Sequence, residues 1–336
     1  MPQFDPEPSP TPLASFSLDT TAIRTDQFGS QSELPATPRH RRVLLPSLLF
    51  LATCLSTYLA GGLAYAVPVM AILTAHEFGH YIQARRYGVP ATWPLFIPFP
   101  FSPFGTMGAV IVQRAGWANR KALFDIAVSG PLAGLVLTIP VLIVGIQMSK
   151  VVSFEPNSKE LSFGTPLLVE WLIELIHGPI SEEQILMWHP VGFAGWVGIF
   201  ITGLNLLPIG QLDGGHILYA LLLRRANVVA WCLLRLAVLV VVAAGSFIDS
   251  SYFGWSVMLV LLVMMGARHP PTADDFVPLG LGRKVLGWMT LAFILIGFTP
   301  APLTVVQPKK PQPIPHQMEH PELWVKVVEG QALRVE

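Results

Sequence analysis

The chain has 336 residues, of which 52% are hydrophobic and only 12% are charged. A soluble domain needs more charged residues than this to cover its surface, so we expect a polytopic membrane protein that lies in a lipid bilayer. The 21 basic residues are balanced by 21 acidic ones, which excludes the strongly basic surface typical of proteins that bind nucleic acid. The two cysteines, Cys54 and Cys232, lie in separate apolar segments, which excludes a disulfide framework.

The two ends of the chain differ in composition from the part between them. Residues 1–42 are rich in Pro, Ser and Thr and show no sustained hydrophobic period, which predicts a disordered tail. The first apolar run begins only near Val43, so we expect no cleavable signal peptide. The domain organisation that follows is a membrane-embedded domain over 43–299 and a C-terminal tail over 300–336.

Apolar runs predict about six to seven transmembrane helices, some of them near the short limit for a bilayer of about 30 Å. These helices are expected at 43–60, 64–84, 122–148, 190–207, 228–247, 252–267 and 284–299. The expected fold class is therefore an all-α polytopic membrane protein.

Basic residues beside the apolar runs predict the orientation. Under the positive-inside rule they face the cytoplasm, and they include Arg39, Arg41, Arg42, Arg85, Arg86, Arg120 and Lys121. The tail over 1–42 is then cytoplasmic and residues 149–189 form an external loop. Within this loop Glu170, Glu174 and His177 recur at helical spacing among apolar residues, which predicts an amphipathic helix on the membrane surface. That helix could be a structural cover or a lateral gate for substrate.

Residues 91–113 interleave prolines with aromatic residues, a pattern that a membrane helix does not accommodate. Met107 to Gln113, at the end of this stretch, is β-prone and predicts a strand. We expect a proline-rich, re-entrant, β-like loop between the second and third helices, with its backbone groups satisfied by protein or water. The strand could pair with an unwound substrate, or the loop could be an interfacial anchor.

Residues His76-Glu77-Phe78-Gly79-His80 lie inside the second apolar run. On a helix the two histidines are one turn apart on one face, so both imidazoles can reach one metal ion. Glu77 points to the neighbouring side, where its carboxylate can accept a proton from a metal-bound water. Polar groups are costly in hydrocarbon, and this cost favours a functional site.

A catalytic zinc site needs one more protein ligand. Asn205 and Asp213 lie at the end of a later apolar run, where Pro208 prevents a regular helix. Asp213 is the candidate third ligand. Read locally, the same segment could instead be a helix-turn-helix in which Asp213 is an N-cap.

Three segments occur in a fixed order: His76-Glu77-x-x-His80, Gly130-Pro131-Leu132-Ala133-Gly134 and Asn205…Pro208…Leu212-Asp213-Gly214-Gly215. Together they resemble the site-2 protease family of intramembrane zinc metalloproteases, over about residues 40–300, and in particular its compact members without a PDZ domain. The resemblance implies one Zn²⁺ per chain, bound by His76, His80 and Asp213, and cleavage of peptide bonds in or near transmembrane segments of substrate proteins. It further implies that Glu77 activates the metal-bound water, that Asn205 holds the scissile carbonyl, and that residues 130–134 pack against the catalytic helix.

Alternatives to this function remain open. A non-catalytic relative could bind membrane helices, and a transporter could use the polar residues to line a path. Ser129 could belong to a rhomboid-type protease and Asp125 to an aspartic one, but the partner residues are missing, so a packing residue and a helix cap or interfacial residue are the simpler interpretations. His216 could lie just outside the metal ligands or on a helix surface. Three other histidines are expected to be solvated: His177, His189 and His269.

The expected location is a bacterial cytoplasmic membrane, with an organellar membrane as the alternative. Since Arg85 and Arg86 follow the second apolar run, the active site lies toward the cytoplasmic side.

Overall fold

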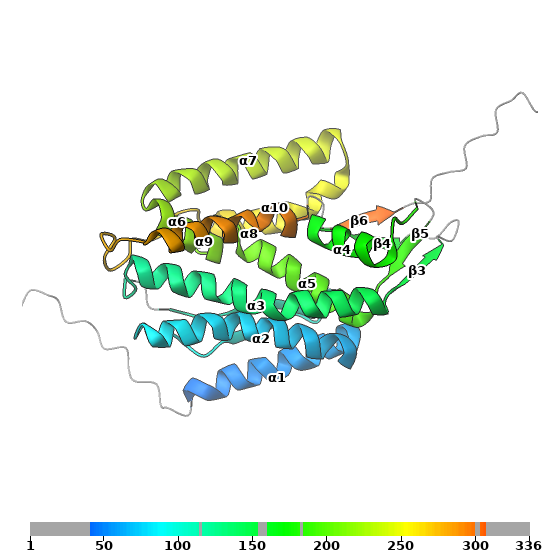
Figure 1. The fold of residues 1–336 in the computed structure, drawn as a ribbon, viewed down its shortest axis with the longest axis horizontal. Coiled ribbons are helices and arrows are strands. Elements are labelled where there is room, and N and C mark those ends of the chain that lie inside the picture. The colour runs from blue at the N-terminus through cyan, green and yellow to red at the C-terminus, as the bar shows by residue number, and fades with distance from the viewer. Residues whose placement is uncertain (1–40, 114–115, 154–159, 182–183, 300–302, 307–336) are drawn as a thin grey trace, which may run out of the picture. The chain divides into compact units, whose positions relative to one another are not determined.

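A computed structural model describes residues 41–113, 116–153, 160–181, 184–299 and 303–306. Within these ranges the chain is mostly helical (Figure 1). Residues 1–40 of the first tail, which is predicted to be disordered, lie outside the described residues. Nearly all of the C-terminal tail lies outside them as well. The domain boundaries drawn from the sequence therefore stay predictions.

The first three predicted helices are found close to their expected bounds, as α1 (Arg41–Gly61), α2 (Leu63–Arg86) and α3 (Arg120–Met148). The next two are α5 (Pro190–Asn205) and α7 (Arg225–Phe247). Each of the last two predicted helices is divided. The first of these consists of a 3-10 segment, Ser250–Trp255, followed by α8 (Ser256–Met265), and the second consists of α9 (Leu281–Ala292) and α10 (Ile294–Gly297).

Three helical segments in the described part are long and apolar enough to cross a membrane: Val43–Gly61, Arg120–Met148 and Arg225–Phe247. Helix α2 is long enough, but the two histidines and the glutamate in its second half reduce its apolar character. Helix α5 is apolar but has only 16 residues. The total of six to seven spans stays a prediction.

The core around the functional residues consists of α2, α3 and α5, which pack against one another. Small residues bring α3 and α5 close together, since a Cβ atom added to Gly145 would lie 2.1 Å from the Cα atom of Gly192. Large side chains fill the space on either side of this contact, among them Leu142, Ile146 and Trp196, all fully buried. Close backbone approach through small residues is the usual way in which membrane helices pack.

A β-hairpin forms in the proline-rich stretch between α2 and α3. Its strands, β1 (Leu95–Pro98) and β2 (Thr106–Val110), are antiparallel, with Phe96 opposite Ala109. The predicted strand is thus present, and its partner β1 is a further strand that the sequence does not predict. Proline is tolerated here because β1 is an edge strand of a two-stranded sheet and its register is irregular between Phe96 and Pro98. Re-entry of this hairpin into the membrane stays a prediction.

The sequence predicts an all-α fold with one β-like loop, but two further strand pairs lie in and near the predicted external loop. Strand β3 (Lys150–Ser153) pairs with β5 (Gln184–Met187), and β4 (Glu160–Phe163) pairs with β6 (Leu303–Val306). These strands have four residues each, too few for a clear hydrophobic period, and their partners are distant in sequence. The predicted amphipathic helix in this loop is present as α4 (Leu167–His177).

Candidate metal centre

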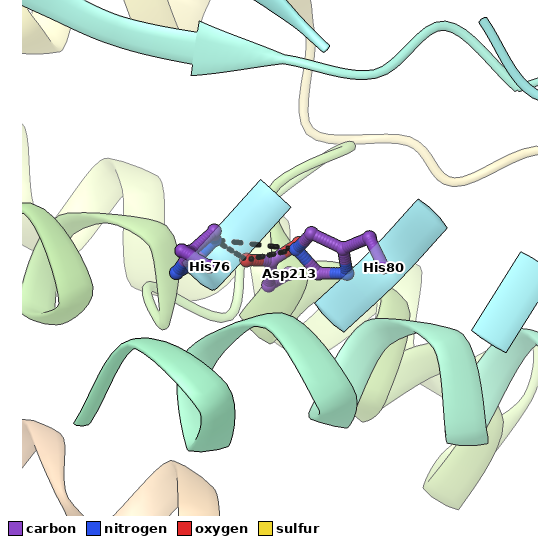
Figure 2. Close-up of side chains that lie close together, drawn as sticks. All are labelled: His76, His80 and Asp213. Atoms are coloured by element: carbon purple, nitrogen blue, oxygen red, sulfur yellow. Dashed lines mark hydrogen bonds and ion pairs between the residues drawn. The ribbon is translucent and has the colours of Figure 1, made fainter. Parts of the chain in front are cut away.

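His76 and His80 project from one face of α2 toward the same point (Figure 2). Both side chains are buried, with 4% and 7% of the residue surface exposed. Their Nε2 atoms are 3.2 Å apart. One helical turn separates the two residues, so the helix itself brings the two imidazoles together.

Asp213 reaches these histidines from α6 (Asp213–Leu222), the helix that follows α5. The connection between the two helices is tight: a Cβ atom at Gly214 would lie 1.9 Å from the carbonyl oxygen of Leu206. Gly210 supplies a left-handed residue, with φ of 58°. The helix-turn-helix considered from the sequence is therefore present, but its N-cap is Leu212 and Asp213 is the first residue of the helix.

The carboxylate of Asp213 completes the group. Its Oδ2 atom lies 3.2 Å from Nε2 of His76 and 3.3 Å from Nε2 of His80 (Figure 2). All three ligand atoms lie within 4.8 Å of one another, and no other such group of His, Cys, Asp or Glu is found among the described residues. The structure thus brings together the three residues that the sequence predicted as metal ligands.

The other ring nitrogen of His80 determines its tautomer. Nδ1 lies 2.7 Å from the carbonyl oxygen of Ile126 on α3. A carbonyl only accepts hydrogen bonds, so Nδ1 carries the proton and Nε2 keeps its lone pair for a metal. This kind of hydrogen bond orients metal-binding histidines in general.

The residues present fit a metal ion. Oδ2 of Asp213 is buried and accepts no hydrogen bond, although two imidazole nitrogens lie close to it. A cation between the three atoms would satisfy this oxygen, whose burial without a partner is otherwise costly. Two imidazole nitrogens and one carboxylate oxygen form a donor set that suits Zn²⁺ and leaves a fourth position open.

A cavity of about 180 Å³ lies beside the three residues. Glu77 and Asn205 line it, as do Ala109 and Val110 of strand β2. The side chain of Glu77 is buried, and the amide nitrogen of Asn205 lies 3.4 Å from Nε2 of His76. Both residues predicted to act in catalysis therefore face the same small space, and their catalytic roles stay predictions.

Residues 130–134 pack against α2, as the family resemblance implies. A Cβ atom at Gly130 would lie 2.1 Å from Nε2 of His80, and one at Gly134 would lie 3.3 Å from Nδ1 of His76. Conversely, a Cβ atom at Gly79 would lie 2.5 Å from the carbonyl oxygen of Ser129. Helices α2 and α3 are therefore in direct contact beside the metal group.

Two polar residues differ from an expected role. Asp125 does not cap α3, because that position belongs to Asn119, whose Oδ1 accepts from the amide of Ala122 at 2.9 Å, and the alternative of an interfacial Asp125 stays a prediction. His269 is not solvated; it is buried, and its Nε2 atom lies 2.6 Å from Nδ1 of His216.

His177 and His189 make hydrogen bonds outside the metal group. Nε2 of His177 lies 2.8 Å from the carbonyl oxygen of Ile146, and Nδ1 of His189 accepts from the amide of Val191 at the start of α5. Ser129 is, as expected, a residue of a helix contact. Its hydroxyl lies 2.9 Å from the carbonyl oxygen of Gly79.

The chain was compared with protein-family models, curated proteins and solved structures. The model of peptidase family M50 matches residues 64–244, which include His76, His80 and Asp213. No solved structure matches the chain.

Three curated plant proteins are similar to the chain. Probable zinc metalloprotease EGY1, chloroplastic, of Arabidopsis thaliana is 26% identical over 252 residues, or 72% of this chain and 44% of that protein. The protein of the same name from Oryza sativa subsp. japonica is 33% identical over 165 residues, or 48% and 28% of the two chains. Probable zinc metalloprotease EGY3, chloroplastic, of Oryza sativa subsp. indica is 27% identical over 258 residues, or 72% and 43%. The chain thus spans less than half the length of these relatives.

Proposed function

The chain belongs to peptidase family M50, the site-2 protease family, and on this premise we propose that it is an intramembrane zinc metalloprotease that cleaves membrane proteins. His76, His80 and Asp213 hold one Zn²⁺ per chain. The observation that supports this proposal most directly is the meeting of three buried ligand atoms from two helices, one of them an oxygen without a hydrogen bond.

Each residue of the site has a chemical task in this proposal. Bound zinc acts as a Lewis acid and lowers the pKa of water. Glu77 accepts the proton that the attacking water loses and later donates it to the leaving amine. The amide of Asn205 donates a hydrogen bond to the oxygen of the scissile carbonyl as negative charge develops there, which is the role of an oxyanion-hole donor.

The substrates in this proposal are transmembrane segments of other proteins. A helical carbonyl is hydrogen-bonded and covered by neighbouring residues, so the segment has to unwind before attack. Strand β2 offers an edge where an extended segment could pair, and Ala109 and Val110 of this strand line the cavity beside Glu77. A substrate paired with β2 would therefore have its backbone next to the residues that act on it.

The protein acts in a membrane, and we propose that its site opens toward the side that carries Arg85 and Arg86 at the end of α2. The expected bacterial membrane has no support from the comparisons, since the three relatives described above are chloroplastic by name.

The test of this proposal uses the full chain in detergent or nanodiscs, with a single-pass membrane protein as substrate. Glu77→Gln is expected to keep zinc and to lose cleavage by more than about a hundredfold, since general base catalysis contributes 10²–10⁴-fold. Glu170→Gln, at an exposed position on α4, is the matched control and keeps both properties. Cleavage by Glu77→Gln at the wild-type rate, or a wild-type protein without zinc, contradicts the proposal.

A further inference from the structure

Three elements meet at an ion pair close to the metal group. Arg283 of α9 binds Asp125 of α3 through two parallel contacts, Nε to Oδ1 at 2.7 Å and Nη2 to Oδ2 at 2.9 Å. The hydroxyl of Tyr87, the residue that caps α2, also donates to Oδ2 of Asp125. This cluster of Tyr87, Asp125 and Arg283 therefore ties together the end of α2, the first turns of α3 and the start of α9.

The ion pair in this cluster is partly buried and bidentate, two features that strengthen it. The side chain of Asp125 is only 13% exposed and that of Arg283 is 34% exposed. Bidentate arginine–carboxylate pairs are stronger and more directional than single contacts between exposed charges. Partial burial, together with the hydrogen bond to Asp125 and its charge, raises the pKa of Tyr87, so its hydroxyl stays protonated and keeps donating.

Asp125 is adjacent in sequence to the residue that orients a metal ligand. The carbonyl oxygen of Ile126 accepts the hydrogen bond from Nδ1 of His80 at 2.7 Å. The hydroxyl of Ser129 lies 2.7 Å from the same oxygen and 2.9 Å from the carbonyl oxygen of Gly79. One turn of α3 thus carries both the ion pair to α9 and the contacts to the catalytic helix.

The packing leaves little room for this turn to move. A Cβ atom at Gly130 or at Gly79 would clash with the facing helix, so α2 and α3 are already in direct contact here. Helix α9 contacts the same turn of α3, since a Cβ atom at Gly287 would lie 2.7 Å from Cε2 of Phe124. Because Asp125 and Ile126 are consecutive residues of this turn, a displacement of Asp125 would move the carbonyl oxygen of Ile126 relative to the ring of His80.

We propose that Tyr87, Asp125 and Arg283 are positioning residues for the metal centre, which hold the carbonyl of Ile126 in place so that His80 presents Nε2 to the metal. The proposal rests on the zinc site proposed above. It assigns a role in that site to Arg283, which lies outside the segment matched by the family model. Among the described residues no hydrogen bond or ion pair joins these three to the metal ligands, so their effect passes through the backbone of α3.

The test measures metal binding rather than cleavage, on the full chain in detergent. Zinc affinity is measured by competition with a chelator, and the site is also loaded with Co²⁺, whose visible absorption reports ligand geometry. Arg283→Gln is expected to weaken zinc binding by about tenfold, the lower end of the effect of altering groups that orient metal ligands, and to change the Co²⁺ spectrum. Arg283→Lys keeps the charge but loses the two-pronged contact, and should recover part of the affinity.

The matched control is Lys284→Gln, at an exposed cation next to Arg283 for which the described residues offer no ion pair. It should bind zinc and Co²⁺ as the wild type does. Tyr87→Phe removes one hydrogen bond and keeps the ring, and should weaken zinc binding by about twofold to threefold. If Arg283→Gln does not fold, the comparison of Arg283→Lys and Tyr87→Phe with Lys284→Gln decides the question.

Two results overturn the inference. In one, the Arg283 and Tyr87 variants bind zinc and give Co²⁺ spectra like Lys284→Gln. In the other, they lower the thermal unfolding temperature but leave metal affinity unchanged, which makes the cluster a structural contact only. Failure of the wild type itself to bind metal is a different outcome, since it contradicts the proposed function as a whole.

Discussion

Nε2 of His80 lies 3.3 Å from Oδ2 of Asp213, although the two residues belong to α2 and α6 and are far apart in the sequence. The metal centre therefore exists only when the connection between α5 and α6 folds tightly enough to bring Asp213 to α2. Metal binding and correct packing of these helices are coupled for this reason.

Replacement of Asp213 tests the third ligand. Asp213→Asn preserves the shape of the side chain but removes its charge, so we expect zinc content to fall by more than about tenfold and cleavage to be lost. Elemental analysis of the purified protein measures the first effect. Asp274→Asn, at an exposed position in the loop before α9, serves as the control and should retain zinc. Equal zinc content in both variants would exclude Asp213 as a ligand.

Gly130 tests the packing of α3 against the site. Gly130→Ala places a Cβ atom 2.1 Å from Nε2 of His80, so the ring has to move and zinc binding should weaken by more than about tenfold. Gly282→Ala is the matched control, because a Cβ atom there meets no atom within 4 Å. It should leave zinc binding unchanged. The prediction is wrong if the two alanine variants bind zinc equally well.

Asn205 tests transition-state stabilisation. Loss of an oxyanion-hole donor typically lowers kcat by about 10²–10³, with substrate binding little changed. We therefore expect Asn205→Ala to lower kcat by that factor while KM stays nearly constant. The amide nitrogen is close to His76, so zinc content has to be measured in the same preparation. A variant that loses zinc together with activity would assign Asn205 to the metal centre rather than to the carbonyl.

Ala109 tests the cavity at the strand edge. Ala109→Phe adds a ring to the lining of a cavity of about 180 Å³, so KM should rise at least several-fold while zinc content stays at the wild-type level. Met107→Phe changes an exposed residue on the same strand that does not line the cavity. Steady-state cleavage of one substrate by both variants provides the comparison. An equal effect of the two substitutions would speak against substrate binding along β2.

The metal group could be predicted from the sequence because its signals are local. His76 and His80 are one helical turn apart, and Asp213 follows a proline and a glycine that interrupt an apolar run. Long-range partners leave no such signal. Arg283 lies 158 residues from Asp125, and His269 lies 53 residues from His216, so neither pairing follows from a spacing.

The lack of a local signal for long-range partners also explains which strands the sequence does not predict. Strand β1 and the pair formed by β3 and β5 were not predicted, because four-residue strands show too little alternation to be recognised before their partners are known. Long apolar helices such as α3 were predicted close to their bounds, since their signal extends over many residues.

X-ray absorption at the zinc edge, measured on the purified full chain, reports the metal and its ligands themselves. We expect one zinc per chain, with two imidazole nitrogens and one carboxylate oxygen at about 2.0–2.2 Å, and with the imidazole signal reduced in His80→Ala. A first shell that contains sulfur, a shell of oxygens alone, or an unchanged spectrum in His80→Ala would contradict it.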